Sequence, residues 1–265
     1  MSSFWSRIAV AVVGIPVVLG LVYLGGWYLF VLIAIAVAVA LHEYWLLSRA
    51  LRPLAPAGYV GGILALVGAE MGGVEWMLGG VLTTLALAFF LKGISEARQA
   101  ATVAISGTFL GAGWIGLGLG FLLVLRGIPH DGRLLTFTVV LAVWAGDTFA
   151  YFGGRLLGRH SMAPTTSPKK TWEGFVFGTA ATVFVSFIAL YKQDVLTITH
   201  SIILGVVLAV AAPLGDLFES LLKRDAGVKD SGSVLGGHGG VLDRLDAFFF
   251  AAPAAYFCLA AFGHI

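Results

Sequence analysis

Four side chains that can bind a metal ion or a phosphate recur at helical spacing near the end of this 265-residue sequence. They occupy positions i, i+3, i+4 and i+7, and they are Asp216, Glu219, Ser220 and Lys223. Residues at these positions lie on one face of an α-helix. That face is acidic at one end and basic at the other, so it could hold a cation beside a phosphate.

A second pair of carboxylates, Asp243 and Asp246, stands at i and i+3 where the next apolar run begins. A glycine-rich loop, residues 232–240, precedes this pair and contains His238. Mg²⁺ prefers hard oxygen ligands and keeps water and phosphate oxygens in its shell, and glycines let backbone N–H groups approach a polyphosphate. These parts together predict phosphoryl or nucleotidyl transfer. The alternative is a salt-bridged cytoplasmic loop, which the density of charges and glycines disfavours.

A further polar stretch begins inside an apolar run. Asp147 lies in that run, and Tyr151 follows one turn later on the same helical face. A carboxylate within a membrane span is a candidate functional group, although Asp147 could instead pair with Arg155 and join two helices. Lys169 and Lys170 stand just before the expected start of a helix at Trp172-Glu173, where phosphate binds readily. They could equally be ordinary basic residues of a cytoplasmic loop.

The composition defines the elements that must position these groups. Hydrophobic residues make up 59% of the chain and charged residues 11%, against about 25% in soluble domains. A water-soluble globule and a disordered chain are therefore both excluded. The net charge is only +2 and no long basic block occurs, which disfavours binding to a nucleic acid polymer. The lone Cys258 cannot form an internal disulfide.

Apolar runs of membrane length recur along the whole chain and predict an all-α polytopic integral membrane protein. We expect a single membrane domain, 1–265, with N-terminal helices in 1–100 and the active site in 101–265. High glycine content, 36 residues, fits close packing of these helices. About nine spans are expected: 8–24, 27–47, 58–73, 75–92, 102–125, 134–152, 174–191, 199–222 and 246–263.

The placement of basic residues predicts the direction of these spans. Of the 16 lysines and arginines, only Arg126, Arg133 and Lys192 fall in outer loops if the N-terminus is cytoplasmic. The positive-inside rule therefore favours a cytoplasmic N-terminus. The same direction places the loops 153–173 and 223–245 in the cytoplasm, and with them the expected active site.

Four short motifs carry a resemblance to a known family. They are Ser220-x-x-Lys223-Arg224, Lys229-Asp230-x-Gly232, His238-Gly239-Gly240 and Asp243-Arg244-Leu245-Asp246. In this order and spacing they resemble the C-terminal signature of the phosphatidate cytidylyltransferases, or CDP-diacylglycerol synthases. Residues 140–250 carry the resemblance most strongly. Gly236 stands where that family often has proline.

The resemblance implies that phosphatidate in the bilayer reacts with CTP to give CDP-diacylglycerol and pyrophosphate, with Mg²⁺ as cofactor. The lipid phosphate would attack the α-phosphorus of CTP, and basic residues and the metal would bring two polyanions together. The family also implies a second, monovalent cation such as K⁺, a bacterial-type cytoplasmic (inner) membrane location and a homodimer.

Combined with the resemblance, the residues take specific expected roles. Asp216 and Asp243 are the leading metal ligands, with Asp147, Glu219 and Asp246 next. Catalysis is expected to depend most directly on four residues: Asp216, Lys223, Asp243 and Asp246. The remaining groups are expected to bind CTP or its phosphates: Lys169, Lys170, Ser220, Arg224, Lys229, His238, Gly239, Gly240 and Arg244.

Other interpretations stay open. The same chemistry could act on another lipid phosphate, such as an ether lipid or a polyprenyl phosphate. An ion-coupled transporter is disfavoured, because its acidic residues usually lie near the bilayer midplane rather than at one edge. Glu43, late in the second apolar run, could face the bundle interior, pair with Arg49 or contribute to the site.

Overall fold

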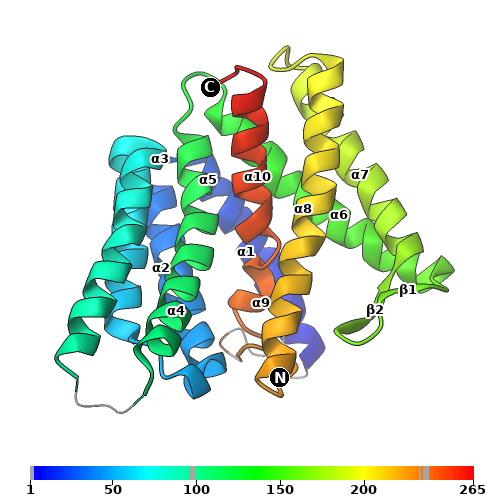
Figure 1. The fold of residues 1–265 in the computed structure, drawn as a ribbon. Coiled ribbons are helices and arrows are strands. Elements are labelled where there is room, and N and C mark those ends of the chain that lie inside the picture. The colour runs from blue at the N-terminus through cyan, green and yellow to red at the C-terminus, as the bar shows by residue number, and fades with distance from the viewer. Residues whose placement is uncertain (1–2, 96–98, 233, 235–238) are drawn as a thin grey trace. The chain divides into compact units, whose positions relative to one another are not determined.

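The structure is a computed structural model that describes residues 3–95, 99–232, 234 and 239–265. In this part of the chain nearly every element is a helix, and the exception is one two-stranded β-sheet (Figure 1). Contacts divide the chain into two compact units. Unit 1 comprises Met1–Gly127 and Asp225–Leu245, and unit 2 comprises Ile128–Arg224 and Asp246–Ile265.

Unit 1 is built from long apolar helices. Its elements are α1 (Ser3–Leu24), α2 (Gly26–Leu47), η1 (Arg49–Leu51), α3 (Ala55–Gly93), α4 (Ala101–Gly111), η2 (Ala112–Leu117), α5 (Gly118–Arg126) and α9 (Leu242–Leu245). The elements α4, η2 and α5 form one continuous helical rod, with a π-helical segment in its middle. α3 packs against α2 and α4 (Figure 1), and Leu41, Leu66 and Ile115 are buried in this core.

The 39-residue helix α3 is interrupted at Gly73, whose φ of 68° and ψ of −152° are not helical. Glycine takes such angles without steric cost, so the chain can turn back there. A Cβ atom at Gly80 would meet the backbone of Ala65, so the two halves of α3 pack closely against each other. The sequence predicts a boundary between two spans at this position, and the break lies there.

Unit 2 contains α6 (Gly132–Leu157), α7 (Trp172–Tyr191), α8 (Ile198–Asp225, whose last residue is counted in unit 1) and α10 (Phe248–Ala261). A short antiparallel hairpin of β1 (Ser161–Ala163) and β2 (Ser167–Thr171) joins α6 to α7. α6 and α7 run antiparallel and pack through glycines: a Cβ at Gly178 would lie 2.8 Å from the carbonyl oxygen of Gly146. Small residues of this kind let membrane helices approach closely.

Thr171 ends the hairpin and begins α7, because its hydroxyl accepts a hydrogen bond from the amide of Gly174 at 3.1 Å. Threonine at this position satisfies one of the free N–H groups of a helix start. The predicted start of a helix at Trp172 is therefore confirmed. The β-hairpin before it was not predicted from the sequence.

Seven helices of the described residues are long and apolar enough to cross a membrane, and Val12–Leu24 forms a shorter apolar helix. The prediction of an all-α polytopic membrane protein is confirmed. The number of spans, the side of the N-terminus and the single-domain organisation stay predictions.

Candidate active site

The polar face predicted on α8 is present in unit 2. The hydroxyl of Ser220 donates to Oδ1 of Asp216 at 3.4 Å, and Nζ of Lys223 lies 2.7 Å from Oε2 of Glu219. Each pair is separated by four residues, so one turn of helix brings its members together. The acidic and basic ends of the face are thus joined by contacts along the helix.

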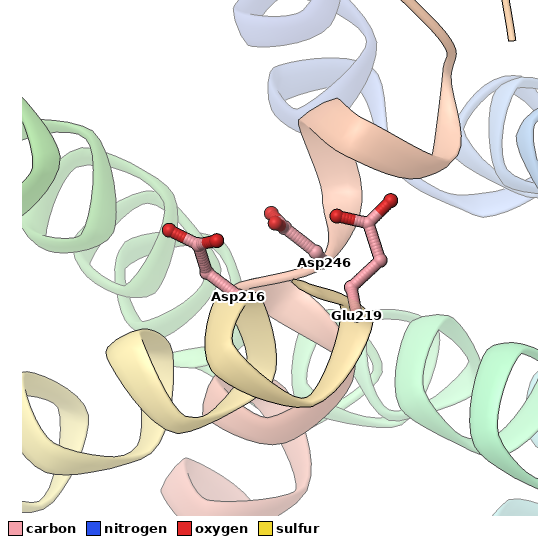
Figure 2. A group of neighbouring side chains, drawn as sticks. All are labelled: Asp216, Glu219 and Asp246. Carbon is pink, nitrogen blue, oxygen red and sulfur yellow. The ribbon is translucent and has the colours of Figure 1, made fainter. Parts of the chain in front are cut away.

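Asp246 adds a third carboxylate to this face. One oxygen from each of Asp216, Glu219 and Asp246 lies within 4.8 Å of the other two. Figure 2 shows Asp216 and Glu219 on α8, with Asp246 reaching the same space from the segment that leads into α10. Gly215 permits this arrangement, because a Cβ at that position would collide with the backbone carbonyl of Asp246. These three residues are called the acidic triad below.

The hairpin supplies a basic residue to the acidic triad. Nζ of Lys170 on β2 lies 2.6 Å from Oδ2 of Asp216. Lys170 is half-buried, whereas the neighbouring Lys169 is exposed. Glu173 in the first turn of α7 accepts hydrogen bonds from the backbone amides of Arg159 and His160, and so ties the segment before β1 to the start of α7.

Burial makes the charge balance of the acidic triad important. The side chain of Glu219 is fully buried and Asp246 is only 8% exposed. Buried charges are costly unless other charges compensate them. Lys170 and Lys223 supply two positive charges against three carboxylates. A cation bound between the three carboxylates would compensate their charge further.

The donor set of the triad fits Mg²⁺, which takes hard oxygen ligands at about 2.0–2.1 Å. Two oxygens on one such ion are therefore at most about 4.2 Å apart. The triad oxygens, all within 4.8 Å of one another, need only small side-chain adjustments to reach that spacing. Asp216, Glu219 and Asp246 are the residues that could hold the metal.

Among the described residues, this group contains neither Asp243 nor Asp147. Asp243 belongs to unit 1, where its Oδ2 atom accepts backbone hydrogen bonds from Gly240 at 2.9 Å and Ser231 at 3.1 Å. Asp147 lies on α6 and lines a pocket with Thr179 of α7 and Pro213 of α8. The predicted ligand roles of Asp243 and Asp147 stay predictions.

The remaining predicted residues of unit 2 fall close to the hairpin. Nε of Arg224 at the end of α8 donates to the carbonyl of Thr166, in the turn between the strands, at 3.2 Å. Arg155 on α6 donates to the hydroxyl of Tyr151 at 2.8 Å. The hairpin is thus tied to α8 through both Arg224 and Lys170.

The remaining predicted residues of unit 1 belong to its 225–245 segment. Lys229 and Arg244 are exposed, and Gly239 adopts a positive φ of 81° that favours glycine. His238 lies outside the described residues. The expected roles of these residues in binding CTP stay predictions.

Glu43 on α2 is the functional candidate that the sequence interpretation left least defined. Its side chain is only 1% exposed and accepts hydrogen bonds from the backbone amides of Val241 at 3.1 Å and Leu242 at 2.7 Å. The hydroxyl of Ser231 donates to the same carboxylate at 3.4 Å. The sequence shows a carboxylate within an apolar run, which marks Glu43 as a candidate. The sequence pattern does not indicate which residues donate hydrogen bonds to it.

The fold and the acidic triad define a polytopic membrane protein with a cluster of acids and lysines suited to binding a cation and phosphate. A model of the cytidylyltransferase family matches residues 5–262. The chain therefore belongs to the cytidylyltransferase family.

Named relatives share much of its length. A phosphatidate cytidylyltransferase of Synechocystis sp. is 34% identical, over 95% of this chain and 94% of that protein. One of Staphylococcus haemolyticus is 30% identical, over 93% and 95%. One of Bacillus subtilis is 40% identical over 58% of this chain and 57% of the relative. The resemblance inferred from the motifs is confirmed.

Proposed function

We propose that this chain is a phosphatidate cytidylyltransferase, which converts phosphatidate and CTP into CDP-diacylglycerol and pyrophosphate. Family membership and the full-length relatives of that name support the reaction. The single structural observation that carries the proposal is the acidic triad with Lys170 and Lys223 in contact with it. Cation and phosphate binding at one place is what transfer between two polyanions requires.

In the proposed reaction, an oxygen of the lipid phosphate attacks the α-phosphorus of CTP, and the bond from that phosphorus to the bridging oxygen of pyrophosphate breaks. A phosphate monoester is already a nucleophile near neutral pH, so no strong general base is needed. Lys170 and Lys223 would orient the phosphates and neutralise charge on the leaving pyrophosphate. Ser220 orients the carboxylate of Asp216 through its hydrogen bond.

We assign the triad of Asp216, Glu219 and Asp246 as the site for Mg²⁺. A bound Mg²⁺ would supply Lewis-acid stabilisation of the phosphate oxygens. A second, monovalent cation such as K⁺ belongs to the proposal as an expectation from the family resemblance. Asp243 remains a proposed further ligand.

We also propose the setting of the reaction. CTP would come from the cytoplasm, and phosphatidate would keep its acyl chains in the bilayer of a bacterial-type inner membrane. The basic residues around the 153–173 and 223–245 segments support a cytoplasmic active site. A homodimer remains part of the proposal, on the resemblance and the glycine-rich helices alone.

Transfer of label from CTP to lipid tests the function directly. Purified protein in phosphatidate-containing vesicles should convert labelled CTP into CDP-lipid only when Mg²⁺ is present. Asp216→Asn and Asp246→Asn should each lower turnover by about 100-fold or more, because each removes a charge from the triad. Asp194→Asn is the matched control: Asp194 is exposed, and its φ of 57° is one that asparagine tolerates.

The same assay separates the rival substrates. Incorporation that requires a polyprenyl phosphate or an ether lipid phosphate instead of phosphatidate would overturn the lipid assignment and keep the chemistry. No incorporation with any lipid phosphate would overturn the proposed function. Full activity of either triad variant at low Mg²⁺ would remove that residue from the metal site.

A further inference from the structure

Glu43 lies in an apolar helix, and its buried carboxylate is fully engaged by a segment almost 200 residues later in the chain. Oε1 accepts the amide of Val241, and Oε2 accepts the amide of Leu242 together with the hydroxyl of Ser231. A buried charge is tolerated where such donors replace water. Ser231 stands just before the glycine-rich loop, and Val241 and Leu242 stand just after it.

Two glycines make room for this carboxylate. The three atoms nearest to a Cβ atom at Gly232 would all belong to Glu43, and its Cδ atom would lie 2.8 Å away. A Cβ atom at Gly240 would lie 2.6 Å from Oε2 of Glu43. Real Cβ atoms do not approach so closely, so residues 232 and 240 must lack a side chain while Glu43 keeps its place. The glycines at both ends of the loop therefore serve the contact with α2.

Asp243 adds a second carboxylate to the same two ends. It accepts the backbone amides of Ser231 and Gly240. Both acids therefore join residue 231 to the 240–242 segment, one from α2 and one from the start of α9. Closing a loop at its base by charge-assisted hydrogen bonds fixes the residues that follow it.

We propose that Glu43 is a positioning residue: it holds Ser231 beside Val241 and Leu242 and thereby sets the place of Asp243 and Arg244 on α9. The expected effect on kcat rests on the proposed function, whereas the expected effect on the structure of residues 240–245 does not. Asp243 and Arg244 are proposed to serve the metal and the phosphates of CTP, and small displacements of such groups lower turnover strongly.

The pattern of donors requires a carboxylate at this position. Each oxygen of Glu43 accepts a backbone N–H group. An NH₂ group in place of either oxygen would point its own N–H at that backbone N–H, and neither group could accept the other's hydrogen. Glu43→Gln keeps the size of the side chain and creates that conflict. Glu75→Gln is the matched control, because Glu75 is an exposed glutamate of the same unit.

Hydrogen exchange of the full-length protein in detergent, read by mass spectrometry, tests the contact without any substrate. Peptides covering residues 240–245 should exchange about tenfold faster or more in Glu43→Gln than in the wild type or Glu75→Gln. Peptides of α6 and α7 should not change. Equal exchange of the 240–245 peptides in all three proteins would overturn the proposal.

Steady-state kinetics then separate positioning from simple structural support. Glu43→Gln should lower kcat by about tenfold or more with a smaller change in the KM for CTP, and its melting temperature should stay close to that of Glu75→Gln. Faster exchange with unchanged kcat would also overturn the proposal, because the contacts of Glu43 would then serve folding alone. An inactive wild type would contradict the proposed function. The exchange result would still show whether Glu43 holds the 240–245 residues in place.

A second variant guards against misfolding of Glu43→Gln. Gly232→Ala keeps the carboxylate but forces it to move, so it should raise exchange in 240–245 and lower kcat in the same direction. In a Glu43→Ala background, the added Cβ has space, and Gly232→Ala should have little further effect on exchange. Independent, additive effects of the two substitutions would show that Gly232 and Glu43 do not act through one contact.

Discussion

Nζ of Lys170 on β2 lies 2.6 Å from Oδ2 of Asp216 on α8. The hairpin between α6 and α7 thus places a positive charge on one member of the acidic triad. A lysine and a divalent cation that bind the same carboxylate compete for it. Lys170 therefore affects both the affinity of the triad for metal and the binding of phosphate beside it.

Lys170→Met should separate these two effects. Removing the ammonium leaves the triad more negative, so the Mg²⁺ concentration for half-maximal activity should fall about threefold or more. Maximal turnover should fall about tenfold or more, because a phosphate partner is lost. Titrations of activity with Mg²⁺ measure both. The control is Lys192→Met, an exposed lysine just after α7 in the same unit; identical Mg²⁺ curves for the two variants would contradict the role of the Lys170–Asp216 contact.

The buried pair of Lys223 and Glu219 predicts a stability effect as well as a catalytic one. Lys223→Met leaves the fully buried Glu219 without this counter-charge, and breaking a buried pair costs about 3–5 kcal/mol. Thermal unfolding in detergent should therefore shift to a clearly lower temperature. The double variant Lys223→Met with Glu219→Gln should recover much of the stability but not the activity. Recovery of both would assign Lys223 to the fold alone.

Asp243→Asn tests whether Asp243 acts through the metal or through the loop. Its Oδ2 atom accepts two backbone amides and its Oδ1 atom also accepts the amide of Ser231 at 3.3 Å, so an asparagine would turn an NH₂ group toward at least one of these donors. We expect kcat to fall about tenfold or more, with faster exchange at residues 240–245 and little change in the half-saturating Mg²⁺ concentration. A large rise in that Mg²⁺ concentration would instead support the ligand role predicted from the sequence.

The C-terminus offers a test of topology. Nε2 of His264 lies 3.3 Å from Oδ2 of Asp131, so the C-terminus and the loop before α6 share one end of unit 2. The distribution of basic residues predicts that this end is outside the cytoplasm. A reporter fused after Ile265 and a cysteine label at position 131 should both respond as non-cytoplasmic. Opposite responses would contradict the contact, and two cytoplasmic responses would reverse the predicted direction.

The polar face of α8 could be predicted because helical spacing is a local property. Asp216, Ser220, Glu219 and Lys223 need only one helix to bring them together, and the structure shows their pairwise contacts. The apolar runs predicted the helices for the same reason, including the boundary at Gly73.

Contacts between distant segments were beyond the sequence pattern. Lys170 reaches Asp216 only because a hairpin, which the all-helical expectation omitted, turns that side chain toward α8. Asp243 and Asp246 were expected to act together from their i, i+3 spacing. In the structure Asp246 joins the acidic triad, whereas Asp243 accepts loop amides. Which residues a carboxylate contacts depends on the packing of distant segments, and helical spacing along the sequence does not predict that packing.

The separation of 188 residues between Glu43 and Ser231 also has a consequence for biosynthesis. Chains grow at about 5–20 residues per second, so Glu43 is synthesised roughly 10–40 s before its hydrogen-bond donors. During that interval its carboxylate must be solvated by water, because an unpaired charge in lipid is costly. Glu43 lies four residues before the end of α2, and the end of a membrane helix is closer to water than its middle. Unit 1 is thus completed only when residues 225–245 emerge, late in synthesis.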